Sequence, residues 1–234
     1  MTAETGSPTY RGEEPPHDLL CREGYVLSHN AETKMPDWVL ERLTPERFKG
    51  RAKRAQDMFK ADPNLPPVRR STPGDYRGSG FDKGHMAPAA DMKFAMQAMI
   101  ESFYMSNMSP QVGIGFNRHI WARLEDQMRI WAECLGTLVV VTGPIYGEAP
   151  KRMQGTDIPI PEAFYKVVYD PDRRRAIGFR LPNKRFDGFD LAPHVVAIRD
   201  IERDTGLNFL TALSSREQKR LESKRAALWR QECP

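Results

Sequence analysis

The strongest constraint on the fold comes from an amphipathic segment in the middle of the chain. Its apolar residues recur at three- to four-residue spacing, at Ile120, Leu124, Met128, Trp131 and Leu135. This spacing places them on one face of an α-helix. Gly136 follows, and glycine is the typical residue just past the end of a helix. A long helix with one buried face is therefore predicted from about Asn117 to Gly136.

Other segments carry strand and short-helix patterns. Residues 24–28 and 38–43 alternate on either side of the turn-rich stretch 30–36, which predicts a hairpin. Further strands are predicted at 138–142, 164–169, 176–181 and 194–198, and a short helix within 94–105. Ser214 and Glu217 form a capping-box pattern at the start of a final helix. Because strands and helices mix without regular βαβ alternation, the predicted class is α+β.

Length and charge bound the organisation and the partners. The 234 residues suit one large domain, predicted over 18–234. The polar, Pro-rich residues 1–17 are expected to form a flexible arm. No apolar run is long enough to span a membrane, and the start does not read as a signal peptide. A net charge of +4 modestly favours a polyanionic partner.

Candidates for chemistry are one histidine and a row of polar side chains. No HExxH, GxSxG or P-loop pattern is present. His85 follows Gly84, whose backbone freedom predicts a sharp turn that projects the imidazole. A neutral imidazole can accept a proton from water near pH 7. On the predicted helix, residues four apart border the apolar face: Asn117, Trp121, Glu125 and Arg129.

This set matches the needs of phosphodiester hydrolysis, which are an activated water and neutralised phosphate charge. Magnesium prefers oxygen ligands such as the Asn117 amide, and arginine binds phosphate through a planar fork. Each residue also has a simpler interpretation. His85 could be an ordinary loop residue, Asn117 a helix cap, and Glu125 with Arg129 an i,i+4 ion pair. The residues alone leave both interpretations open.

The segment from Phe81 to Asp91, FDKGHMAPAAD, resembles the DRGH signature of the DNA/RNA non-specific endonucleases. This ββα-metal family includes mitochondrial endonuclease G and secreted bacterial nucleases. The resemblance continues through residues 103–111, 117–129 and 141–144, and more weakly over 24–43 and 201–209. It implies a ββα-metal core within a mixed, mainly antiparallel sheet flanked by helices.

The resemblance also implies roles at the metal and the attacking water. His85 is expected to be the general base, and Asn117 the one direct protein ligand of Mg2+. Glu125 is expected to reach the metal or its waters. Asn107 is expected to position the histidine or the scissile phosphate. Mn2+ or another divalent cation is the expected substitute for Mg2+.

Further positions are implied at the phosphate. Arg129 and Arg54 are expected to contact it, and Asp82, with Gly84, to serve as structural or orienting residues. Lys83 departs from the family, which most often has arginine there. A lysine keeps the charge but loses the planar fork, so its phosphate contact is expected to be single and looser.

Substrates implied by the resemblance are DNA and RNA, single- or double-stranded, cut to leave 5′-phosphate ends. A nucleic-acid-binding protein with a decayed site is an alternative, for which Lys83 is the only hint. A toxin or defence nuclease, with a protein inhibitor, is another. A homodimer is left open, since the family contains monomers and dimers. Export to the periplasm or medium requires a removed leader, and a cytoplasmic location is the alternative.

Overall fold

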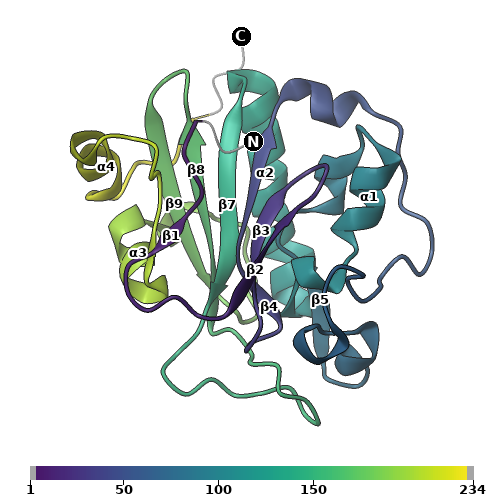
Figure 1. Cartoon of the computed structure of the whole chain (residues 1–234). Helices are drawn as coiled ribbons and strands as arrows, with labels where there is room; N and C mark the ends of the chain where they lie inside the picture. The colour runs from purple at the N-terminus through teal and green to yellow at the C-terminus, as the bar shows by residue number, and fades with distance from the viewer. Residues whose placement is uncertain (1–3, 231–234) are drawn as a thin grey trace.

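A seven-stranded sheet forms the centre of the computed structural model, which describes residues 4–230 (Figure 1). The strand order is β10-β9-β8-β7-β4-β3-β2, and all neighbouring pairs are antiparallel. The strands are β2 (His17–Cys21), β3 (Val26–Asn30), β4 (Met35–Leu43), β7 (Leu138–Ile145), β8 (Ala163–Asp170), β9 (Arg175–Pro182) and β10 (Val195–Val196). The antiparallel architecture expected from the sequence is present.

Helices cover both faces of this sheet. Along β7, Leu138 and Val140 pack in the same apolar cluster as α2 (Ala122–Leu135). Val139 and Val141 point to the other face, where α3 (Ile198–Thr205) and α4 (Ser215–Glu222) pack. This alternation explains why β7 is apolar throughout, because a strand buried on both faces needs no polar positions. No helix within residues 4–230 is long and apolar enough to cross a membrane.

A smaller two-stranded sheet lies on the α2 side, opposite α3 and α4 (Figure 1). β5 (Phe81–His85) pairs with β6 (Met108–Val112), and His85 stands opposite Met108. The connection between them contains α1 (Met96–Ser102). β6 leads directly into a helical segment over Gly113–Trp121, which continues as α2. Two strands and a helix thus follow one another as a ββα unit.

The long helix was predicted correctly, with a kink at its start. Ile114 and Gly115 have non-helical dihedral angles, and Gly115 has a positive φ of 85°, so the continuous helix begins just after them. The five apolar residues that defined the helix by their spacing are all buried. Trp121 is also fully buried, so it belongs to the core rather than to the rim of the apolar face.

The other elements largely follow the sequence patterns. β3 and β4 form the predicted hairpin, with a register shift between Ser28 and His29. β8 and β9 include the predicted strands, whereas the strand expected at 194–198 has only two paired residues. The Ser214 side chain caps α4 by accepting a hydrogen bond from the Glu217 backbone N–H.

The flexible arm expected at the N-terminus is wrong for residues 4–17, and residues 1–3 lie outside the described residues. β1 (Thr9–Tyr10) pairs with β11 (Leu207–Asn208), and Thr5 is only 1% exposed. Arg11 donates to the buried carboxylate of Glu202 at 2.8 Å. The backbone pairs attach the segment to β11 and the ion pair attaches it to α3, and the local sequence reveals neither contact.

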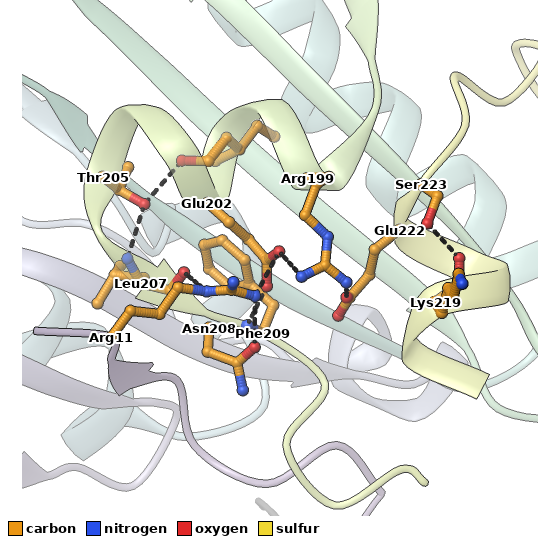
Figure 2. Close-up of polar contacts among 11 residues, drawn as sticks. Arg11, Arg199, Glu202, Thr205, Leu207, Asn208, Phe209, Lys219, Glu222 and Ser223 are labelled. Carbon is orange, nitrogen blue, oxygen red and sulfur yellow. Dashed lines mark hydrogen bonds and ion pairs between the residues drawn. The ribbon is translucent and has the colours of Figure 1, made fainter. Parts of the chain in front are cut away.

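Glu202 belongs to a buried cluster that joins α3 to α4 (Figure 2). The Arg199 guanidinium lies between two carboxylates, 3.0 Å from Glu202 and 2.7 Å from Glu222. Arg11 approaches Glu202 as well, and the Phe209 backbone N–H donates to its second oxygen at 3.1 Å. Both carboxylates are almost completely buried, so their partners fix the position of α4 against the sheet.

Candidate active site

The segment Asp82-Lys83-Gly84-His85 lies in strand β5 and is not the tight turn expected from the sequence. Gly84 has no positive φ. It is required for a different reason: a Cβ atom there would lie 2.1 Å from Oε1 of Gln111, the side chain packed across from it. The glycine therefore allows β5 to approach Gln111 closely, and strand pairing with β6 projects His85.

The His85 ring is held between aromatic side chains. Its centroid lies 4.9 Å from that of Phe103, edge to face, and 5.7 Å from that of Phe59. Burial and the nearby charge of Arg54 lower the pKa of His85 to about 3. The imidazole is therefore neutral at physiological pH, the form that can accept a proton. Nε2 is buried without a hydrogen-bond partner among residues 4–230.

Asn117 faces the same pocket from the first turn of the long helix. Its amide nitrogen donates to Oδ2 of Asp82 at 2.8 Å, which fixes the orientation of the amide. Arg118 binds both oxygens of the same carboxylate. Burial raises the pKa of Asp82, but the bonds from Arg118 and Asn117 outweigh it and hold the pKa below its ordinary value. Asp82 is thus ionised and holds the Asn117 amide in one orientation.

The Asn117 side chain is not a helix cap. It lies inside the helix and makes no capping hydrogen bond, and its nitrogen is committed to Asp82. The carbonyl oxygen is therefore the atom left for a ligand. An amide oxygen suits a hard divalent cation that keeps most of its water. Among residues 4–230 no group of three or more His, Cys, Asp or Glu side chains could hold a metal ion together.

Two cations complete the pocket. Arg54 is exposed and lies over the Phe103 ring at 5.0 Å and the Phe59 ring at 5.6 Å. Lys83 approaches the Phe59 ring from its own strand, with Nζ 4.9 Å from the centroid. Neither side chain forms an ion pair within the described residues. Both charges are therefore available to an anion beside His85.

A cavity of about 460 Å3 collects these groups. It is lined by Arg54, Phe59, Phe81, Asp82, Lys83, His85, Asn117 and Arg118. Arg54 comes from the loop after residue 50 and meets the residues of the ββα unit in this cavity. Five of the residues singled out in the sequence thus surround one space: Arg54, Asp82, Lys83, His85 and Asn117.

Asn107 is close to this cavity but does not face it. Its side chain is 0% exposed, and all of its hydrogen bonds go to backbone. Its nitrogen donates to the carbonyls of Ala87 and Ser102, and its oxygen accepts from the N–H of Ala87, each at 2.9 Å. Of the two expected roles, this geometry supports positioning of the chain just after His85 and leaves no atom for a phosphate.

Glu125 and Arg129 lie further along the helix and do not pair with each other within residues 4–230. Arg129 instead donates to the buried carboxylate of Asp91 at 2.7 Å and to Asp126. Its guanidinium therefore holds α2 to the segment following His85, and the expected phosphate contact of Arg129 stays a prediction. The contact with Asp91 could not be predicted from helix spacing, because Asp91 is distant in sequence.

Glu125 sits among charges buried between the helix and the sheet. Burial raises its pKa to about 7, although Lys166 and Arg129 act against the rise. Lys166 is 1% exposed, donates to Thr142 Oγ1 at 2.7 Å and lies 5.0 Å from the Trp121 ring. Burial lowers the pKa of this lysine. Glu125 and Lys166 therefore interact electrostatically between α2 and the sheet, and neither of them lines the cavity beside His85.

Several site residues were missed in the sequence. Phe59 carries no motif, and Phe103 begins the resembling stretch 103–111 but was given no role; both become recognisable as site residues only when they meet around His85. Arg118 directly follows Asn117, so its role beside Asp82 had a positional signal in the match over 117–129. Lys166 lies in an apolar strand, where a lone lysine is an unusual residue and was a usable signal.

Comparisons with known proteins agree on one family. Residues 4–216 match the family model described as DNA/RNA non-specific endonuclease. Nuclease C1 from Cunninghamella echinulata var. echinulata is 42% identical over 212 residues, covering 84% of each chain. Human mitochondrial endonuclease G is 34% identical over 212 residues, covering 85% of this chain and 71% of that protein.

A solved structure gives the same result in three dimensions. The crystal structure of the EndoG/EndoGI complex contains a chain that matches with a TM-score of 0.79 at 31% identity. The match covers 93% of this chain and 95% of the other. The similarity therefore extends over the sheet, the ββα unit and the helices that surround them.

Proposed function

Because this chain belongs to the DNA/RNA non-specific endonuclease family, we propose that it hydrolyses phosphodiester bonds of both DNA and RNA, with Mg2+ as its metal ion and 5′-phosphate ends as its products. Metal-dependent nuclease activity follows from the family. One observation supports the finer proposal: a neutral His85, an oriented Asn117 amide and the cations Arg54 and Lys83 line a single cavity.

His85 is the proposed general base. Its depressed pKa keeps the imidazole free of a proton at neutral pH. Part of that depression comes from the charge of Arg54, and a phosphate bound to Arg54 would neutralise it. The nucleic acid would therefore raise the proton affinity of His85 at the moment when a water molecule must lose its proton.

Asn117 would hold the metal through its amide oxygen, with Asp82 keeping the amide turned toward the cavity. A bound Mg2+ would supply neutralisation of the charge that develops on the phosphate. Glu125 is eight residues further along the helix, about 12 Å of rise. We propose that it acts through water of the metal shell rather than as a direct ligand.

Arg54 and Lys83 are the proposed phosphate contacts. Arg54 offers a planar fork, and its stacking on Phe103 and Phe59 limits the positions it can take. Lys83 offers a point charge next to His85 in the strand. Asn107 and Arg129 are the proposed positioning residues. Asn107 fixes the chain after His85, and Arg129 fixes α2 through Asp91.

Digestion of plasmid DNA and of RNA, each with Mg2+ and with excess chelator, tests this function. We expect both substrates to be cut only with Mg2+, and His85→Ala to lose at least about a hundredfold in rate, as for other general bases. His17→Ala on the edge strand β2 is the matched control and should cut normally. Undiminished cutting in chelator, or none with either substrate, would sink the proposal.

Asn117→Ala separates a metal ligand from a structural residue. The change removes one partly exposed hydrogen bond to Asp82, so it should cost only about 1 kcal/mol of stability. Cutting should nevertheless be abolished, and titration with Mg2+ in a calorimeter should show no binding. Wild-type rates at saturating Mg2+ would refute the ligand role of Asn117.

Partners other than nucleic acid are proposed by analogy. The solved relative is described in a complex that explains EndoG inhibition, so a protein inhibitor is proposed for this chain as well. Since human endonuclease G is named as a mitochondrial protein, a location inside the cell is proposed ahead of export. A homodimer is kept as a prediction, and measurement of the mass in solution tests it.

A further inference from the structure

A second cavity, of about 300 Å3, opens beside the active-site cavity. It is lined by Ala52, Lys53, Arg54, Ala89, Ala90, Lys93 and Met99. Arg54 lines both cavities. The volume is at the lower end of the range for small-molecule pockets. The active-site mechanism uses none of the other lining residues.

We propose that this second cavity binds one unstacked nucleobase of the substrate strand, next to the phosphate that is cut. The inference rests on the proposed function, because it names the part of the substrate that occupies the neighbouring space. A nucleobase within a strand is a planar, largely apolar ring flanked by phosphates. The walls and the rim of the cavity match these two parts separately.

The walls are apolar and fixed. Ala89 and Ala52 pack against the main core, and Met99 is only 3% exposed behind them. The Ala52 N–H donates to the carbonyl of Lys93 at 3.0 Å, which joins the two sides of the cavity. At Gly50 the backbones approach so closely that a Cβ atom would lie 1.9 Å from the same carbonyl oxygen. The space is therefore held open by backbone contacts.

The rim is positively charged. Lys53, Arg54 and Lys93 are all exposed, and none of them forms an ion pair within residues 4–230. Unpaired cations around an apolar pocket complement a base with phosphates on either side. Arg54 connects the cavities, so a phosphate bound to it would place the adjoining base at the apolar walls. An acidic or neutral ligand without a ring would use the rim but not the walls.

This arrangement has a consequence for substrate choice. A base can enter the cavity only when it leaves the stack of its neighbours, which costs a few kcal/mol in a duplex and little in a single strand. The chain should therefore prefer single-stranded DNA or RNA over a duplex of the same length. The preference should come from the walls of the cavity, while the rim cations act on both forms.

Filling the cavity tests the proposal. Ala90 is half-exposed and does not belong to the core, so Ala90→Leu should occupy the space without disturbing the fold. Binding is measured by fluorescence anisotropy in chelator, with a labelled oligothymidylate and with an abasic strand of the same length and charge. Wild type should bind oligothymidylate roughly tenfold more tightly than the abasic strand, the scale expected for burying a small apolar group. Ala90→Leu should remove this difference and leave abasic binding unchanged.

Two controls define the outcome. Ala149→Leu, in the exposed loop after β7, should keep the wild-type difference. Lys93→Gln should weaken both strands equally, and Lys151→Gln should weaken neither. Equal binding of the two strands by wild type would overturn the base-binding role, and it is the result expected of a cavity used only by a protein partner. An Ala90→Leu variant that weakens the binding of both strands alike would overturn the role as well. Failure of wild type to cut either nucleic acid would instead refute the proposed function.

Discussion

At the scale of single residues, the chemistry of His85 depends on its neighbours more than on its motif. The ring lies against Phe103 and Phe59, and the same two rings carry the Arg54 guanidinium. Because Arg54 and His85 lie against the same two aromatic rings, protonation of His85 beside the charged Arg54 is electrostatically unfavourable. The aromatic pair thus contributes to the burial that lowers the pKa of His85, and it limits the positions of the Arg54 guanidinium, the proposed phosphate contact.

Arg54→Gln should therefore raise the pKa of His85. The wild-type pKa is lowered to about 3 by burial and by Arg54, from an ordinary value of 6.5. Removing the charge leaves the burial contribution, so the pKa should rise but stay below 6.5. Titration of the His85 ring by NMR measures this, with Arg203→Gln on α3 as the control. An unchanged His85 pKa in Arg54→Gln would show that the two groups are not coupled.

At the scale of elements, the sequence patterns predicted the helices and strands that local residue spacing defines. They missed those that depend on pairing with a distant segment. The long helix and the β3–β4 hairpin were found because their apolar periodicity is local. β5 was taken for a turn because its segment is polar and contains glycine, and only β6 makes it a strand. The candidates His85 and Asn117 came from residue chemistry together with the motif resemblance, whereas the contact between Arg129 and Asp91 was missed because Asp91 is distant in sequence.

The β5–β6 pair should be sensitive to any side chain at position 84. A Cβ there meets Gln111, which is completely buried, so Gly84→Ala should destabilise the chain by about 1–3 kcal/mol through overpacking. Adding Gln111→Ala should restore part of the loss, because it removes the clashing atoms. Gly188→Ala, with open space around its α-carbon, is the control. Denaturant midpoints that are equal for Gly84→Ala and wild type would exclude close packing as the reason for this glycine.

The contact between α3 and α4 should respond to pH. Burial and the charge of Glu202 raise the pKa of Glu222 to about 7, from 4.5, despite the opposing charge of Arg199. The folded state therefore holds a proton that the unfolded state has lost between pH 4.5 and 7. Stability must fall as the pH rises through this window and level off above it.

Glu222→Gln should flatten that dependence, since a glutamine carries no titrating proton. Thermal midpoints measured from pH 5 to 8 should fall less steeply in Glu222→Gln than in wild type. The difference in slope should correspond to at most one bound proton. Glu133→Gln, exposed on α2, should reproduce the wild-type curve. Parallel curves for Glu222→Gln and wild type would show that this carboxyl does not titrate in the window.

At the scale of the whole molecule, the positions of the positive charges matter more than their small net excess. The net charge is only +4, and many arginines are neutralised by buried or neighbouring carboxylates. The cations without an ion pair in the described chain include Lys53, Arg54, Lys83 and Lys93, which surround the two adjoining cavities. A modest overall charge is therefore compatible with a local concentration of cations around the two cavities, which the sequence total alone could not locate.

This arrangement predicts how salt should affect binding. If Lys83 contacts a phosphate, Lys83→Gln should lower the slope of log affinity against log salt concentration by about 1, because one fewer counterion is released. Lys219→Gln removes the same charge from α4, on the other side of the sheet, and should leave the slope unchanged. Lys83→Arg should keep the slope and bind more tightly, since the planar fork adds a second hydrogen bond. An identical loss of slope in the Lys83 and Lys219 variants would mean that the chain attracts nucleic acid through its total charge, and that the position of Lys83 beside His85 has no special part in binding.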